Sequence, residues 1–428
     1  MDDFLTKQKA SFMRRAACAG AIACFAISSG LSVTGALADP AGRAALILSE
    51  DGLGDAGWND LAWLGLKQAK EEGLVDDIDV FTSNPTEILG LFTSLASAGQ
   101  HDLIISNDWN YSTALAQTAN AFPNQNFAAM DSMPAFEDGD IGKDGTMTVL
   151  YSQEQVSALA GAAAAFAAIE KGGSKVGLVL GMEFSILHDF EVGFKFGVQW
   201  AADYMAANKA DLYNASAFAA TDPTERVLWT YTGTFADPAI GKSATTVQLE
   251  QGASVVYQVA GGTGIGVLTG VGDYHRDNNI PFTELPWSIG VDAAQEWIDP
   301  SVLVSAMKRQ DRAARDLIEM VANGTFRDDI ANNNGVMLMS LTNNGVKLSN
   351  PEILQESMEA AVAAGKLDQS KMDQILAEYT QLRASLSKEA WSAISDLEKK
   401  IMSGEIVVPK PSADPVKWDI QALREELG

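Results

Sequence analysis

From Arg43 onward, short apolar runs alternate with amphipathic helical patterns, and this alternation limits the possible folds more than any other feature of the chain. The connections between the two patterns are short, which is typical of a parallel β-sheet with helices on both faces. The predicted strands of this first unit are Ala44–Leu48, Ile78–Phe81, Leu103–Ile105, Phe127–Met130 and Thr146–Tyr151. A first α/β unit therefore ends close to residue 150.

The same alternation starts again with an alanine-rich helical pattern at 153–170. Further strands are predicted at Val176–Leu180, 228–235, 254–259, Trp287–Val291 and Val302–Met307. No sequence repeat relates the two units, yet two α/β units of similar size are the simplest interpretation. We therefore predict an α/β fold of two Rossmann-like lobes with parallel sheets, with a ligand in the crevice at the carboxyl ends of the strands.

Three crossovers between the lobes are expected, near residues 151, 302 and 330. Lobe one then holds 43–150 and 303–330, and lobe two holds 151–302 and 331–349.

The character of the chain changes after Asn350, where three apolar stripes at helical spacing predict three amphipathic helices. They form a C-terminal helical segment at 350–404, which ends at Gly404 and is followed by a tail at 405–428. Such stripes either dock a partner or pack on the lobes, and packing is the commoner role.

The first 38 residues have the pattern of an export signal. A positively charged start is followed by residues 16–38, which carry no charge and end in Ala36-Leu37-Ala38, a small-x-small cleavage site. We expect a cleaved signal peptide and a periplasmic mature protein. A retained membrane anchor is the alternative, and Cys24 after Ala-Ile-Ala leaves a lipid anchor as a third. Cys18 and Cys24 are the two cysteines, so the predicted mature chain has no disulfide and no thiolate metal site.

The chain is strongly acidic, with a formal charge of −26. Removing residues 1–38 leaves 26 basic against 54 acidic residues. A surface that follows a phosphate backbone is basic, so nucleic acid is not an expected partner.

The stretch at 255–266 runs from a predicted buried strand through four glycines into a helical pattern. Bare backbone N–H groups at the start of a helix can receive a ligand. Its spacing is neither a P-loop nor the dinucleotide fingerprint. A tight turn that needs glycine only for packing explains the stretch equally well.

Several ordered motifs resemble the basic membrane protein family, the PnrA-like nucleoside-binding proteins of ABC importers. They cover the mature chain to about Pro409, apart from residues around 350–385. The motifs are Asp55-Ala-Gly-Trp-Asn-Asp60 with Ala62-Trp-Leu-Gly65, Phe190-Glu-Val-Gly-Phe-Lys195-x-Gly197, Thr232-Gly-Thr-Phe-Ala-Asp237-Pro238, Ala260-Gly-Gly-Thr-Gly-Ile-Gly-Val267, Ile289-Gly-Val-Asp292, Met307-Lys-Arg309-x-Asp311 and Gly404-Glu-Ile-Val-Val-Pro409. The resemblance implies the type I periplasmic-binding-protein fold, and the 190–197 motif resembles a turn into the helix of lobe two.

The family resemblance also implies roles for individual residues. Trp58 and Phe235 match the aromatic rings that hold a purine, and stacking on such rings is worth about 1–3 kcal/mol per base. Asp131 and Asp292 match carboxylates that accept ribose hydroxyls, and Lys308 matches a basic contact near the sugar. Gly262 matches the backbone approach, and Asn59 matches an amide that reads a base edge.

This sequence departs from the family pattern at places where the cleft is expected. Trp58 stands where phenylalanine is usual, and Asp60 follows Asn59 where glutamine is common. Asn107-Asp-Trp-Asn-Tyr111 replaces a Gly-Phe-rich stretch, so Trp109 is either an additional ligand wall or a cap on lobe one.

We therefore expect an exported, monomeric solute-binding protein that delivers a nucleoside, with a purine base, to an ABC permease in the inner membrane. The alternative is a ligand sensor, or a binding protein for another small heterocycle or a sugar, that presents its ligand state to a membrane receptor. A nucleoside-processing enzyme is disfavoured, because the three histidines are scattered and no aspartate cluster or Gly-x-Ser-x-Gly motif is present. No catalytic residue, metal or cofactor is expected.

Overall fold

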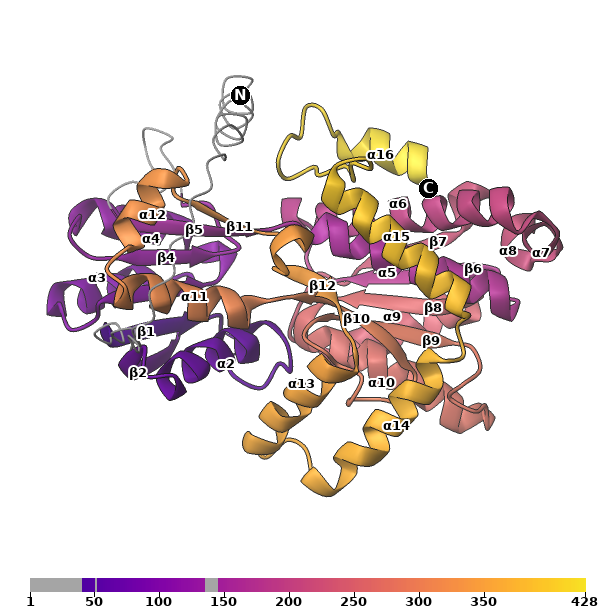
Figure 1. The fold of residues 1–428 in the computed structure, drawn as a ribbon, viewed down its shortest axis with the longest axis horizontal. Helices are drawn as coiled ribbons and strands as arrows, with labels where there is room; N and C mark the ends of the chain where they lie inside the picture. Colours follow the sequence, from indigo (N-terminus) through magenta and orange to yellow (C-terminus); the bar gives the residue numbers. More distant parts are fainter. Residues whose placement is uncertain (1–40, 51, 135–144) are drawn as a thin grey trace, which may run out of the picture. The chain divides into compact units, whose positions relative to one another are not determined.

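The computed structural model describes residues 41–50, 52–134 and 145–428, and the predicted signal peptide lies outside these ranges. Two six-stranded sheets each form the centre of one lobe (Figure 1). The first sheet is parallel throughout, with the strand order β11-β5-β4-β3-β1-β2. Its strands are β1 (Ala41–Leu48), β2 (Val75–Thr82), β3 (Leu103–Asn107), β4 (Phe127–Met130), β5 (Thr146–Tyr151) and β11 (Val336–Met339).

The second sheet has the order β12-β10-β9-β8-β6-β7, and within it only β12 runs antiparallel to its neighbour. Its strands are β6 (Lys175–Leu180), β7 (Val227–Tyr231), β8 (Ala253–Val259), β9 (Trp287–Asp292), β10 (Val302–Lys308) and β12 (Val346–Leu348). The two parallel-sheet lobes confirm the predicted α/β fold class.

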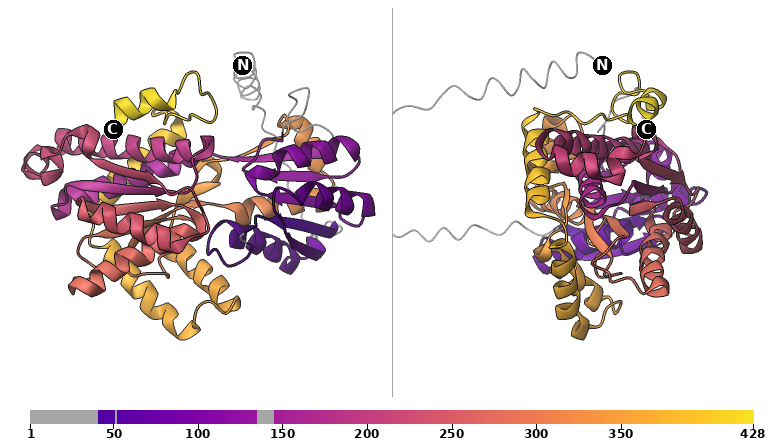
Figure 2. Two further views of the ribbon diagram at one scale, coloured as in Figure 1. Left: turned by 180° about the vertical axis from the view of Figure 1, so that it is seen from behind. Right: turned by 90° about the vertical axis from the view of Figure 1, so that its right-hand side faces the viewer.

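Helices cover both faces of each sheet (Figure 2). In β1, Ala44 and Leu46 pack into one core cluster, whereas Ala45 and Ile47 pack into another with residues of α3 and α4. This alternation follows the two-residue period of a strand that is buried on both faces. The helices of lobe one are α2 (Trp58–Glu71), α3 (Ile88–Ala98), α4 (Ser112–Ala121), α11 (Gln310–Ala322) and α12 (Phe326–Asn332).

In lobe two, α5 and α6 pack against each other very closely because glycines form their contact. A Cβ atom at Gly161 would lie 2.0 Å from the carbonyl oxygen of Phe194, and one at Gly197 would lie 1.9 Å from that of Ala158. The helices of this lobe are α5 (Gln153–Lys171), α6 (Ser185–Asn208), α7 (Ala210–Ala215), α8 (Ala217–Ala220), α9 (Pro238–Glu250) and α10 (Gly261–Asn278). The 190–197 motif therefore lies inside α6, and its glycines serve packing instead of a turn.

Strand pairing differs from the predicted lobe boundaries in two places. Strand β10 pairs with β9 in the second sheet, so the second crossover lies between β10 and α11 and not near 302. Strand β11 pairs with β5 in the first sheet, so the third crossover lies between β11 and β12 and not near 330. The apolar run at 302–307 predicts a buried strand, but such a run carries no information on which sheet receives it.

The C-terminal helices pack on lobe two. They are α13 (Pro351–Ala363), α14 (Met372–Arg383), α15 (Lys388–Ser403) and α16 (Ile420–Leu427), and Gly404 ends α15 in the left-handed conformation. Leu354 and Met358 of α13 and Tyr379 of α14 form a small core with Met307 of β10. Short 3-10 helices lie at Trp109–Tyr111, Pro223–Glu225, Leu341–Asn343 and Gln369–Lys371.

Candidate ligand-binding site

The loop at 54–60 precedes α2 and is held by two of its own carboxylates. Asp55 accepts hydrogen bonds from the backbone amides of Gly57 and Asn59, at 3.0 and 2.8 Å. Asp60 accepts hydrogen bonds from the amides of Gly54 and Ala56, at 2.9 and 2.8 Å. Burial raises the pKa of Asp55 to about 6 in spite of these amides. The loop is therefore a defined structure that fixes where Trp58 begins the helix.

The side chains of Asn59 and Trp58 are both held by hydrogen bonds to Asn107. Asn59 is 1% exposed, and its amide donates to the hydroxyl of Ser49 and accepts from the side chain of Asn107. It thus ties the loop to the ends of β1 and β3. The indole N–H of Trp58 donates to the carbonyl of Asn107 at 2.9 Å, which fixes the plane of the ring.

Lys308, the last residue of β10, is buried at the centre of a group that we call the lysine cluster: Trp58, Asp131, Tyr151, Phe190 and Lys308. Its ammonium group donates to the carboxylate of Asp131 at 2.5 Å. It also lies over the rings of Trp58 and Tyr151, 4.7 Å from each centroid, and 5.4 Å from that of Phe190. Aromatic faces attract a cation, so the rings and the carboxylate together compensate the buried charge.

Asp131 and Asp292 each adopt a left-handed backbone at the carboxyl end of a strand. Asp131 follows β4 of the first sheet with φ 54°, and Asp292 ends β9 of the second with φ 62°. This conformation is uncommon for residues other than glycine, and such strain concentrates at functional sites. Each lobe thus contributes one carboxylate from the strand ends where ligands bind in open α/β sheets.

Asp292 is the most perturbed acid of the site. Desolvation by burial raises its pKa to about 7, Lys308 acts against this rise, and the charges of Asp55 and Asp131 add to it. None of the described residues donates a hydrogen bond to its side chain. A ligand hydroxyl that donated to this carboxylate would therefore satisfy an acceptor that the protein leaves open.

Tyr151 brings a second unsatisfied group to the same place. The residue is 1% exposed, and its hydroxyl has no hydrogen-bond partner within the described ranges. Burial, together with the charges of Asp131, Asp311 and Asp292, raises its pKa well above the usual value. The hydroxyl is therefore neutral and can donate to a ligand.

Three other rings form a second group, which we call the aromatic cluster: Trp109, Phe184 and Phe235. Trp109 of lobe one stacks on Phe184 of lobe two, with centroids 4.3 Å apart and planes 18° apart. Phe184 meets Phe235 edge to face at 6.3 Å. The 4.3 Å stack leaves no room for another ring between Trp109 and Phe184, so a base could enter there only if the lobes separated.

The glycines at the start of α10 have two different roles. A Cβ atom at Gly264 or Gly266 would lie 1.7 Å from the side chain of Gln258 or 1.8 Å from the carbonyl oxygen of Pro238, so these two glycines serve packing. Gly261 has φ 53° and, with Gly262, lies beside Phe235. The helix that starts here confirms the predicted strand-to-helix turn, and the amide of Thr263 in its first turn donates to the carbonyl of Phe235 at 2.8 Å.

The eight candidate residues therefore divide into three sets. Trp58, Asp131 and Lys308 are in contact, and the charges of Lys308 and Asp131 shift the pKa of the nearby Asp292. Trp109, Phe235 and Gly262 lie at the aromatic cluster, whereas Asn59 is engaged within lobe one.

Sequence reasoning missed Tyr151, Phe184 and Phe190. Phe184 stands between β6 and α6, at a strand-to-helix junction like the one at 259–262, and that position is the signal that could have found it.

No metal centre is apparent within the described residues, because no group of three or more His, Cys, Asp or Glu side chains there is placed to hold an ion. Among the same residues, no helix is both long and apolar enough to cross a membrane.

Comparison with known proteins agrees with the two-lobed fold. A family model described as ABC transporter substrate-binding protein PnrA-like matches residues 43–412. An uncharacterized lipoprotein of Pyrococcus horikoshii is 31% identical over 374 residues, covering 87% of this chain and 84% of the relative. The ABC transporter nucleoside-binding protein BmpA of Lactococcus lactis is 26% identical, covering 76% of this chain and 86% of that protein.

A solved structure resembles the whole fold. The solute-binding protein of an ABC transporter system from Aeropyrum pernix K1 has a TM-score of 0.75 at 28% identity, covering 91% of this chain and 100% of the other. Substrate-binding proteins of ABC transporters bind a small molecule and work with a permease, which is not an enzymatic role. The match over 43–412 spans most of the chain, and the chain belongs to the PnrA-like family of ABC transporter substrate-binding proteins.

Proposed function

We propose that the ligand is a nucleoside, with a purine base, bound between the two lobes. The observation that carries this proposal is the pairing of Asp131 and Asp292, one from each lobe, around the buried ammonium group of Lys308. Carboxylates accept hydrogen bonds from vicinal hydroxyls, and a ligand without such donors would leave a buried acceptor unpaired. A ribose supplies those hydroxyls.

The base would use the aromatic residues. Trp58 presents one ring within the lysine cluster, and Trp109, Phe184 and Phe235 supply three more. Stacking is tolerant of the identity of the base, so these rings support a flat heterocycle in general and select little among purines. The similarity to a relative named as a nucleoside-binding protein supports the same ligand class.

We also propose where the protein acts and with which partner. It would act as a monomer outside the cytoplasmic membrane and deliver its ligand to an ABC permease in that membrane. A cleaved signal peptide would release it into the periplasm. The lipoprotein names of the Pyrococcus relatives favour the alternative of a lipid anchor, for which Cys24 is the candidate residue.

The test is mass spectrometry of small molecules released from the purified, denatured protein (residues 39–428), followed by calorimetry with adenosine, guanosine and inosine. A released purine nucleoside, or a dissociation constant in the micromolar range or below, supports the proposal. A different released compound, or no binding to any nucleoside, would discard the purine ligand and leave the family assignment intact.

A further inference from the structure

The hairpin of α13 and α14 is anchored on lobe two, and it lies within the residues that the family model matches, although the sequence motifs do not extend to it. Its apolar residues Leu354, Met358 and Tyr379 pack with Met307 of β10 and Ala294, which follows β9. The neighbouring Ser349 donates to the buried carboxylate of Glu296. The hairpin therefore moves with lobe two.

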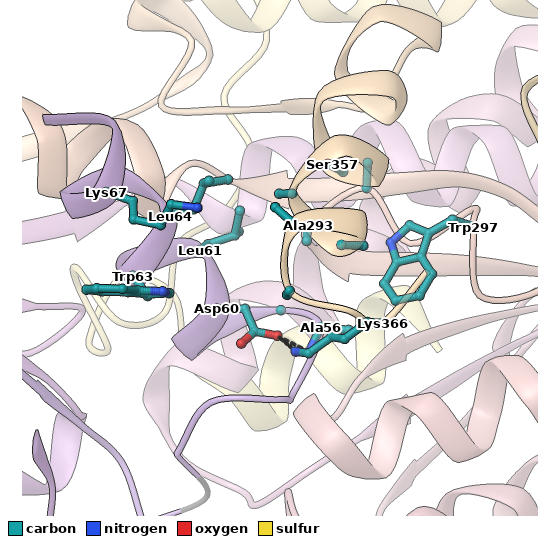
Figure 3. A pocket seen from close by; sticks show the side chains of 16 residues that line it. Ala56, Asp60, Leu61, Trp63, Leu64, Lys67, Ala293, Trp297, Ser357 and Lys366 are labelled. Atoms are coloured by element: carbon teal, nitrogen blue, oxygen red, sulfur yellow. Dashed lines mark hydrogen bonds and ion pairs between the residues drawn. The ribbon is translucent and has the colours of Figure 1, made fainter. Parts of the chain in front are cut away.

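One side chain of this hairpin reaches lobe one. Lys366 donates to the carboxylate of Asp60 at 2.5 Å, across 306 positions of sequence (Figure 3). Gly365 has φ 70°, and the amide of Lys366 donates to the carbonyl of Ala361 at 2.9 Å, which closes α13. The turn that ends the helix thus sets the position of Lys366.

Asp60, the partner of Lys366, organises the loop at 54–60. Asp60 uses its two carboxylate oxygens to accept the amides of Gly54 and Ala56. The carbonyl of Ala56 in turn accepts a hydrogen bond from Gln295 of lobe two at 3.2 Å. Lys366 therefore joins a chain of contacts that runs through the loop to Trp58.

The interface around this ion pair is incompletely filled. A cavity of about 180 Å³ lies between α2, the residues after β9, and α13 (Figure 3). Small side chains form much of its wall: Ala56, Gly57, Ala293, Ala294, Ala360, Ala361, Ala363 and Ala364. An incompletely filled interface loses few van der Waals contacts on separation, so the ion pair carries a larger share of the contact.

We propose that Lys366 is a positioning residue for the loop at 54–60 and that the α13–α14 hairpin holds this loop against lobe two when the lobes are together. This role deepens the proposed function, because it rests on the loop forming one wall of the ligand site. Lys366 itself does not touch the ligand. Its side chain is 31% exposed and that of Asp60 is 24% exposed, so the effect is modest in size.

The experiment compares the parent protein with Lys366→Ala, Lys366→Arg and the matched control Lys371→Ala, an exposed lysine of the same hairpin. Amide hydrogen exchange is measured on peptides that cover 52–60, without ligand, together with thermal unfolding. Lys366→Ala should exchange about three- to fivefold faster at Gly54 and Ala56, while the melting temperature changes little. Lys366→Arg should restore protection, and Lys371→Ala should match the parent.

A second measurement uses inosine as the probe. Lys366→Ala should raise its dissociation rate constant about three- to fivefold and leave the association rate constant nearly unchanged, because the loop is released more readily after binding. Unchanged exchange at 52–60 in Lys366→Ala overturns the positioning role. If the parent protein does not bind inosine or the other purine nucleosides, the proposed function fails, and the exchange measurement still decides the role of Lys366.

Discussion

Asp131 and Asp292 both stand in the left-handed conformation at the end of a strand; Asp131 is buried and bonded to Lys308, and Asp292 is half-buried and interacts with the charge of Lys308. A left-handed residue turns the chain sharply and aims the side chain away from the strand direction. Glycine would adopt this backbone without strain but has no carboxylate. The strained backbone at both positions supports the proposal that these carboxylates serve a ligand.

We expect Asp292→Ala to weaken nucleoside binding by at least about tenfold. The melting temperature of the ligand-free protein should change little or rise slightly, because burial of this carboxylate disfavours its charged form. Calorimetry and thermal unfolding measure the two effects. Equal affinity of variant and parent would remove Asp292 from the site.

The raised pKa of Asp292 predicts pH-dependent binding. Its carboxyl group faces Lys308, Asp55 and Asp131, and its pKa in the ligand-free protein is about 7. Ligand hydroxyls that donate to the carboxylate favour its ionised form, so the complex lowers this pKa. Affinity should therefore rise about tenfold from about pH 6 to about pH 8. Asp292→Asn should flatten this dependence, and a parent profile that is already flat would contradict it.

Whereas ligand affinity should rise with pH, the contribution of Asp292 to the folding stability of the ligand-free protein should fall with pH. Its folded pKa lies above its unfolded value, so the folded protein binds the proton more tightly. The contribution of protonated Asp292 to the free energy of unfolding is present at low pH and is lost as the pH rises through about 7. Because Asp55, Glu154 and Asp189 also have raised pKa values, only the difference from Asp292→Asn isolates this contribution.

At the scale of elements, the sequence was informative wherever a strand or helix is defined by local pattern. Strands β4 and β5 begin and end at the predicted residues, and α5 differs from its prediction by one residue. The choice of sheet for β10 and β11 was not predictable, because it depends on partners far away in sequence. The contact of Phe184 was not predicted for the same reason, since its partner Trp109 belongs to the other lobe.

The segment after Pro409 reaches the first crossover between the lobes. Lys410 donates to the carbonyl of Tyr151 at 2.6 Å, and its ammonium group lies 3.4 Å from the carboxylate of Glu154. Ser412 donates to Asp189 from its backbone amide at 2.8 Å and also from its hydroxyl. The segment therefore fixes the backbone where β5 leads into α5.

Lys410→Met should lower the free energy of unfolding by about 2–4 kcal/mol at about pH 8, because it leaves the buried carboxylate of Glu154 without its cation. The pKa of Glu154 is already raised to about 7 by burial, and loss of Lys410 should raise it further. Protonation removes the unpaired charge, so the loss should be smaller at about pH 6.

Urea unfolding at the two pH values measures this difference. Glu154→Gln in the Lys410→Met background should recover part of the stability at the higher pH. If Lys410→Met lowers the free energy of unfolding equally at both pH values, the effect of Lys410 does not depend on the charge of Glu154.

At the scale of the whole molecule, specific side-chain contacts connect the two lobes within the described residues. They include the ion pair of Lys308 with Asp131, the hydrogen bond of Gln295 with Ala56, and the stack of Trp109 on Phe184. A ligand that binds between the lobes shifts the population only by its different affinities for the open and closed states. These contacts set the equilibrium on which such a ligand acts.

We expect Trp109→Ala to favour the open state of the ligand-free protein, because it removes a stacked ring pair between the lobes. Small-angle X-ray scattering should then give a larger radius of gyration than that of the parent. Trp200→Ala is the matched control, since Trp200 stacks on Tyr204 within α6 of lobe two. A radius equal to that of the parent in Trp109→Ala would show that this stack does not hold the lobes together.

The lysine cluster is built on the segments that join the lobes. Tyr151 ends β5 at the first crossover, and Lys308 ends β10 at the second, with the ammonium group of one over the ring of the other. Both residues therefore stand where the chain crosses between the lobes, at the kind of position that acts as a hinge when two-lobed binding proteins close. A ligand that displaced Lys308 from Tyr151 would act directly on the two segments that join the lobes, so its binding would be coupled to their movement.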